Sequence, residues 1–103
     1  MTYRLEILPA AVRDMVQTAR YISRDLGSPE AAERLAQEIT EAIDRIPSFP
    51  YANPAYAPIR PLEREYRKVR VQNYLIFYWV SETAKTTTVA RVIYARRNMD
   101  SAL

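Results

Sequence analysis

Cysteine and histidine are both absent from the 103 residues of this chain. Without cysteine there can be no disulfide, no thiolate metal ligand and no thiol nucleophile. Without histidine there is no Ser-His-Asp triad, no usual zinc or iron site, and no side chain whose ordinary pKa lies near neutrality. We therefore expect no metal and no cofactor, and a fold that is held without covalent links.

Long apolar runs are missing as well. The longest one, Tyr74 to Val80, is far shorter than the roughly 20 residues that a membrane-spanning helix requires. The N-terminal MTYRLEILPAAVRD lacks the apolar block and small-residue cleavage site of a secretory signal. We expect a cytoplasmic protein, and the length predicts one domain over residues 1–103 with a single modest core.

Acidic and basic residues are divided unevenly between the two halves of the chain. Residues 1–59 hold six bases and eight acids, whereas residues 60–103 hold nine bases and four acids. The first half is therefore acidic and the second half is basic, although the whole chain carries a net charge of only +3. Such polarisation indicates an anionic or acidic partner for the second half.

The first half has the pattern of one strand and two helices. Residues 3–8 alternate as a half-buried strand does, and residues 12–26 repeat apolar side chains at spacings of three and four, as an amphipathic helix does. Gly27, the only glycine, suits a left-handed helix C-cap, and Ser28 suits the N-cap of a second helix. That second helix should end at Pro47.

The second half has the pattern of a loop and three strands. Residues 47–62 contain five of the seven prolines and no glycine, which predicts a stiff, extended connector. Residues 65–71 and 88–95 follow the strand period of two, and residues 74–80 are apolar on both faces, as in a central strand that is covered on two sides. The fold class is therefore α+β with the order β-α-α-β-β-β, in which a helix hairpin packs on one face of a small antiparallel sheet.

Alternation in these strands predicts a bare, basic face on the sheet. If Val69 and Val71 point toward the helices, Lys68 and Arg70 point away, and Arg91 joins them from the last strand. Two further bases follow that strand, Arg96 and Arg97.

Some residues on these strands have a structural alternative. Arg91 could pair with a carboxylate such as Glu6 instead of meeting a ligand. Aromatic side chains on strands are expected in the core, except for Tyr66, which could stack on a target. Strict alternation also places Val89 on the opposite face of the last strand from Val92.

Motifs along nearly the whole chain carry a resemblance to a known family. They read LPAAVRDM, ARYI, AAERL and IPSFPY in the first half, and EYRKVRV, NYLIFYWV and RVIYARRN in the second. In this order and spacing they resemble the RelE/ParE superfamily of bacterial type II toxin-antitoxin toxins, which includes plasmid stabilisation proteins. The resemblance implies a growth-inhibiting toxin kept silent by a cognate antitoxin protein, whose acidic segment wraps the hairpin and the sheet.

Members of that superfamily have one of two activities. ParE-like toxins poison DNA gyrase, whereas RelE-like toxins cleave mRNA in the ribosomal A site. The C-terminal aromatic of the RelE-like nucleases is missing here, and Leu75 stands where they often have an arginine. The resemblance therefore favours poisoning of DNA gyrase. The alternatives are a metal-free, ribosome-dependent mRNA endonuclease and an inactive relative that only binds the antitoxin.

The resemblance also implies site residues. A nuclease would use Arg67, Arg70 and Arg97 to stabilise the reacting phosphate, with Glu63 or Glu65 as a base. Binding of the target is assigned to four other residues, Lys68, Arg91, Arg96 and Tyr66.

Overall fold

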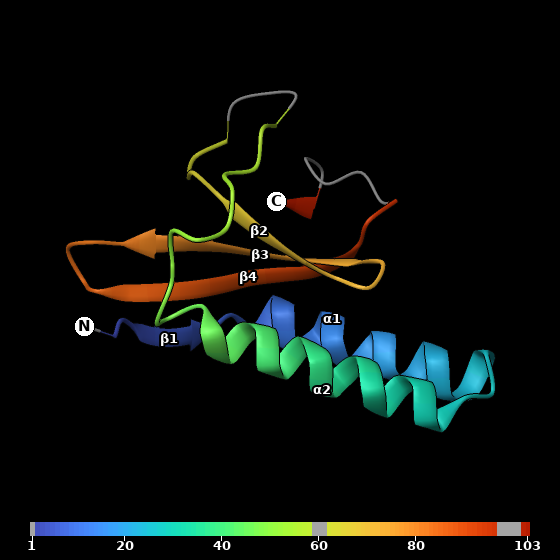
Figure 1. The fold of residues 1–103 in the computed structure, drawn as a ribbon. Helices are drawn as coiled ribbons and strands as arrows, with labels where there is room; N and C mark the ends of the chain where they lie inside the picture. The colour runs from blue at the N-terminus through green and yellow to red at the C-terminus, as the bar shows by residue number, and fades with distance from the viewer. Residues whose placement is uncertain (1, 59–61, 97–101) are drawn as a thin grey trace.

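Two helices lie along one face of a four-stranded sheet in the computed structural model, which describes residues 2–58, 62–96 and 102–103 (Figure 1). In chain order the elements are β1 (Arg4–Ile7), α1 (Pro9–Arg20), a π-helical turn η1 (Tyr21–Asp25), α2 (Pro29–Arg45), β2 (Arg67–Val71), β3 (Tyr74–Ser81) and β4 (Thr86–Tyr94). This order confirms the predicted β-α-α-β-β-β layout.

The sheet has the strand order β1-β4-β3-β2. Strands β2, β3 and β4 form the predicted antiparallel meander. Strand β1 pairs in parallel with β4, from Arg4 opposite Thr86 to Ile7 opposite Val89, so the sheet is mixed. Parallel neighbours need a long connection, and the helix hairpin and the meander provide it.

Local sequence signals set the ends of the two helices. Pro9 occupies the first turn of α1, where the missing N–H costs nothing. Gly27 adopts the left-handed φ of +65° that closes the hairpin, and the Ser28 hydroxyl accepts a hydrogen bond from the Ala31 N–H at 3.3 Å. Helix α2 ends just before Pro47, as predicted.

The main core lies between the helices and the sheet. Helices and sheet contribute buried side chains at 8% exposure or less: Ala11, Leu35, Ile39, Ala42, Ile43, Ile46, Val71, Ile76, Tyr78, Val89 and Val92. Burying each large aliphatic side chain stabilises the fold by about 1.5–3 kcal/mol. This core holds the helices firmly on one face of the sheet.

A β-bulge interrupts the pairing of β3 with β4. The register shifts between Phe77 and Tyr78, which leaves Ala90 of β4 without an opposite residue. As a result Val89 and Val92 both pack in the core under the helices. The prediction that these two valines lie on opposite faces is wrong, because strict alternation does not hold across a bulge.

The proline-rich connector starts in the helix layer at the end of α2 and passes to the side of the sheet away from the helices (Figure 1). Buried Tyr78 fixes its first part by donating a hydrogen bond to the Pro50 carbonyl at 2.6 Å and accepting one from the Asn53 amide at 3.2 Å. An isolated bridge between Ala55 and Arg67 fixes its middle. Within the described residues, none of the helices is sufficiently long and apolar to cross a bilayer.

Candidate functional site

The face of the sheet opposite the helices carries a second apolar cluster. Phe77 and Ile93 are almost fully buried there. Five residues from the connector, the sheet and the C-terminus cover them: Tyr56, Tyr66, Leu75, Ala102 and Leu103. The prediction of a bare face is therefore wrong at the centre of that face. Large apolar side chains there are stabilised when other residues bury them away from water.

Tyr66 belongs to this cover. Its ring is half-buried and meets the ring of Trp79 edge-on, with 5.9 Å between the centroids. The edge-to-face arrangement is one that aromatic pairs prefer. The structure therefore gives Tyr66 a packing role, and its contact with a target stays a prediction.

Of the predicted cations that remain accessible, two lie on β2 and one lies beyond β4. Half-buried Lys68 has its Nζ 5.8 Å from the ring centroid of Tyr56. Exposed Arg70 donates hydrogen bonds to the β2–β3 turn, at 2.8 Å to a carbonyl and 3.3 Å to a side-chain oxygen. Arg96 is exposed just beyond β4, and Arg97 lies outside the described residues.

Arg67 is bound to the connector. Its Nη1 donates to the Asn53 carbonyl at 2.7 Å, and its Nη2 lies 3.4 Å from a Glu65 carboxylate oxygen. Its guanidinium also lies over the ring of Tyr51, 4.8 Å from the centroid. These contacts hold the start of β2 against the connector.

The structure does not bring Arg67 and Arg70 together. Arg67 is paired in register with Tyr78, which belongs to the core under the helices, whereas Arg70 is paired with Leu75, which belongs to the second cluster. Three residues along a strand span about 10 Å and end on opposite faces. Arg67 and Arg70, the two predicted nuclease arginines that the structure describes, therefore leave β2 on opposite faces of the sheet.

Arg91 is held in an internal ion pair. Its Nε and Nη2 donate to the two oxygens of Asp14 in α1, at 2.7 Å and 2.9 Å. The Val92 N–H donates to the same carboxylate at 2.9 Å, and Arg91 Nη1 donates to the Ala102 carbonyl at 2.8 Å. The hydrogen bonds with Asp14 raise the pKa of the guanidinium above its ordinary value. A structural role is thus found, although the partner is Asp14 and not Glu6.

A polar cluster around Glu82 has no counterpart among the sequence predictions. Lys85 Nζ and the Tyr3 hydroxyl donate to the Glu82 carboxylate at 2.8 Å and 2.7 Å, and the Tyr51 hydroxyl donates to it as well. These bonds, that from Lys85 first, lower the pKa of Glu82 to about 2, and the bond with Glu82 raises the pKa of Tyr51 to about 12. Three distant segments supply these residues, so no local pattern marks them.

The arrangement offers little for proton transfer or metal chemistry. The shifts at Glu82 and Tyr51 move both groups away from neutral pH, whereas an effective general acid or base needs a pKa near it. The parts of the chain that the structure describes contain no group of three or more carboxylates able to hold a metal ion.

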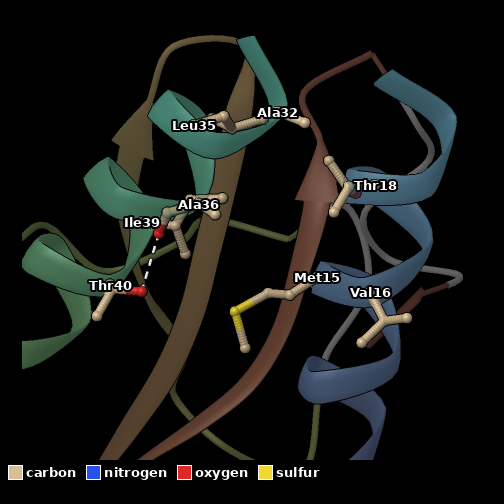
Figure 2. A pocket seen from close by; sticks show the side chains of 9 residues that line it. Met15, Val16, Thr18, Ala32, Leu35, Ala36, Ile39 and Thr40 are labelled. Carbon is tan, nitrogen blue, oxygen red and sulfur yellow. Dashed lines mark hydrogen bonds between the residues drawn. The ribbon is translucent and has the colours of Figure 1, made fainter. Parts of the chain in front are cut away.

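An apolar groove opens between α1 and α2, on the other side of the molecule from the connector (Figures 1 and 2). It encloses about 280 Å³, and in Figure 2 the side chain of Met15 points into the space between the two helices. The Thr40 hydroxyl donates a hydrogen bond to the Ala36 carbonyl at 2.8 Å, so this donor is used within helix α2. Nine residues line it: Met15, Val16, Thr18, Ala19, Ala32, Leu35, Ala36, Ile39 and Thr40.

The family model that describes the ParE toxin of type II toxin-antitoxin systems, parDE, matches residues 5–99. No curated protein sequence matches the chain.

Solved structures of toxin-antitoxin proteins have the same fold. The chromosomal ParDE system of P. aeruginosa superposes with a TM-score of 0.70 at 17% identity, over 92% of this chain and 98% of that chain. The RelBE2 complex of Mycobacterium tuberculosis gives 0.65 at 17% identity, over 91% and 99% of the two chains. The archaeal RelE-RelB complex of Pyrococcus horikoshii OT3 gives 0.61 at 17% identity, over 94% and 99%. At this level of identity the likeness shows the fold alone.

Proposed function

Because the chain belongs to the ParE toxin family of type II toxin-antitoxin systems, we propose that it arrests growth by binding and poisoning DNA gyrase. The observation that carries this choice is that Arg67 and Arg70 leave β2 on opposite faces of the sheet. A poison that acts by binding needs neither a general base nor cations that converge on one phosphate.

An RNA-cleaving site has stricter requirements. Its cations must point at one phosphoryl group, and a proton acceptor must lie within hydrogen-bond reach of the attacking hydroxyl. Arg67 is instead bound to Asn53 and Glu65, and Arg91 is bound to Asp14. These contacts direct both arginines toward partners within the protein and not toward one shared phosphate. The mRNA endonuclease is the competing activity that the test must distinguish.

Purified toxin tests the proposal in two parallel assays. We expect it to inhibit DNA supercoiling by purified gyrase and to leave mRNA intact in a translating ribosome mixture. Cleaved mRNA with normal supercoiling would reverse the assignment. Normal growth after expression of the toxin alone would instead identify an inactive relative that binds only the antitoxin.

One exposed arginine allows a matched comparison in the supercoiling assay. Arg70 lies on β2, whereas Arg24 is exposed on η1 at the far end of the hairpin. Arg70→Gln should weaken inhibition by roughly three- to tenfold, because an exposed cation contributes about 1 kcal/mol to an acidic interface. Arg24→Gln removes the same charge and should leave inhibition unchanged. Equal effects of the two variants would show that net charge alone matters.

We assign the cognate antitoxin to the groove between α1 and α2. An amphipathic helix with apolar side chains on one face would fill such a groove. Val16 lines the groove and is 44% exposed, whereas Val12 is 47% exposed on the same helix and does not line it. Exposed apolar side chains beside a hollow are typical of a protein-binding surface.

These two valines form a matched pair for a binding measurement. Val16→Glu should weaken the toxin-antitoxin complex by at least about tenfold in isothermal titration calorimetry, because it places a charge in an apolar contact. Val12→Glu should leave the affinity within about twofold. Equal affinities for both variants would place the antitoxin elsewhere on the toxin.

A further inference from the structure

A second hollow lies where the connector meets β2 and β3. It encloses about 290 Å³ and is lined by six residues: Tyr51, Arg64, Glu65, Arg67, Trp79 and Val80. Two guanidinium groups and two aromatic rings therefore meet around one small space. Arg64 lies outside the set of predicted site residues.

Each guanidinium of the hollow lies on an aromatic ring. The Cζ of Arg64 is 4.1 Å from the ring centroid of Trp79, and that of Arg67 is 4.8 Å from the ring centroid of Tyr51. A guanidinium that lies over a ring still has its N–H donors in its own plane. These donors can bind a carboxylate or phosphate through two parallel hydrogen bonds. The rings thus hold the donors in place without using them.

Within the described part of the chain, the Arg64 guanidinium contacts the ring of Trp79 and leaves its N–H donors unpaired. Among the residues that the structure describes, no hydrogen-bond acceptor or carboxylate lies within bonding distance of its guanidinium, whereas Arg67 is bound to Asn53. Glu65 is the single carboxylate that lines the hollow, and it contacts Arg67 through a long bond of 3.4 Å with 71% of its side chain exposed. The hollow therefore carries one positive charge in excess.

We propose that Arg64 and Arg67 form a binding site for one carboxylate side chain of an acidic protein segment. A strand of nucleic acid would need a track of cations and open ring faces for its bases. Here each ring already carries a guanidinium on one face, and Glu65 would repel a second phosphate. A single Asp or Glu side chain matches the one excess positive charge of the hollow. Naming the antitoxin as the source of that segment rests on the proposed function, whereas the site itself does not.

The sequence supplies a reporter for this site, because Trp79 is the only tryptophan of the chain. Titration of the purified toxin with a hexaglutamate peptide should give a saturable change in tryptophan fluorescence, and a hexaglutamine peptide should give none. Anisotropy of a fluorescein-labelled hexaglutamate gives a second readout that does not depend on the Arg64–Trp79 contact. Absence of saturable binding in both measurements would overturn the proposal.

Two substitutions that remove the same charge locate the binding. Arg64→Gln should weaken hexaglutamate binding by about tenfold or more, since a charge-assisted pair of hydrogen bonds is lost. Arg24→Gln on η1 should change it by less than about twofold at the same ionic strength. Equal losses in the two variants would show unspecific attraction and overturn the site. Tighter binding of a hexathymidylate oligonucleotide than of hexaglutamate would overturn the choice of an acidic peptide. Gyrase is absent from these titrations, so a failed supercoiling assay leaves their result unaffected.

Discussion

Removing the Asp14 carboxylate should destabilise this fold more than any other single loss of a polar group. The side chain of Asp14 is 10% exposed, that of Arg91 is 21% exposed, and two hydrogen bonds of 2.7 Å and 2.9 Å join them. The same carboxylate accepts the Val92 N–H at 2.9 Å. Strand β1 pairs with β4 only as far as Val89, so Asp14 takes the place of a strand partner for this N–H group.

The size of the effect follows from what Asp14→Ala leaves behind. A buried charge that loses its partner costs about 3–5 kcal/mol, and an unsatisfied buried N–H costs about 1–3 kcal/mol. The two costs overlap, and water can reach the partly exposed Arg91, so we expect a loss of about 3 kcal/mol. Domains of this size are stable by only about 5–15 kcal/mol. The urea midpoint should then fall by roughly 1–3 M.

Urea unfolding of the single and double variants checks this reasoning. Asp14→Ala and Arg91→Ala together should cost at least about 1 kcal/mol less than the sum of the two single changes, because they share one interaction. The control is Glu6→Ala, which breaks the exposed pair of Arg4 and Glu6 at 3.8 Å and should cost less than about 0.5 kcal/mol. Additive losses, or a loss below about 1 kcal/mol for Asp14→Ala, would refute the structural role of the pair.

Three further changes probe the turn, the polar cluster and the connector. Gly27→Ala should lower the free energy of unfolding by about 1 kcal/mol, because alanine resists the φ of +65°; an unchanged urea midpoint would contradict this. The hydrogen bond from Lys85 is the largest cause that lowers the pKa of Glu82 from 4.5 to about 2. The charge of Glu82 therefore stabilises the fold above pH 4.5, and this contribution is lost as the pH falls toward 2. In Glu82→Gln the loss of stability between pH 5 and pH 2 should be smaller, and parallel curves for the two proteins would refute this. Tyr78→Phe leaves the Pro50 carbonyl without its donor and should cost about 1–2 kcal/mol in urea unfolding; a change within error would show that water replaces the hydroxyl.

The sequence predicts those parts of the fold whose causes lie within a few residues. Gly27 and Pro47 mark helix ends through their own backbone limits, and the apolar run at Tyr74 marks a strand that is covered on both faces. The bulge at Ala90 has no such local cause, since it arises from the register between two strands. The parallel pairing of β1 likewise depends on where β4 arrives after the rest of the chain has folded.

The candidate site is harder to predict because its charges act through partners that are distant in sequence. The strand pattern indicates that Arg91 is a surface cation. In the structure Arg91 is paired with Asp14, which is 77 positions away in the sequence. Composition tells us that bases are in excess, but it does not tell us which of them the fold neutralises. Arg64 shows the reverse case, because it has no local motif and still lies beside Trp79 at an open hollow.

Most of the unpaired positive charge in the second half of the described chain lies at the β2 edge of the sheet. In the second half of the chain, within the described residues, Arg91, Lys85 and Arg67 each have a carboxylate partner. Those without one lie on β2, just before it, or beyond the end of β4: Arg64, Lys68, Arg70 and Arg96. Strand β2 is an edge strand, so its cations also discourage pairing with the edge of another sheet. The apolar groove is formed by the helices on the opposite face. One antitoxin chain that binds both surfaces must therefore be an extended segment that passes around the molecule, with apolar residues for the groove and acidic residues for the edge.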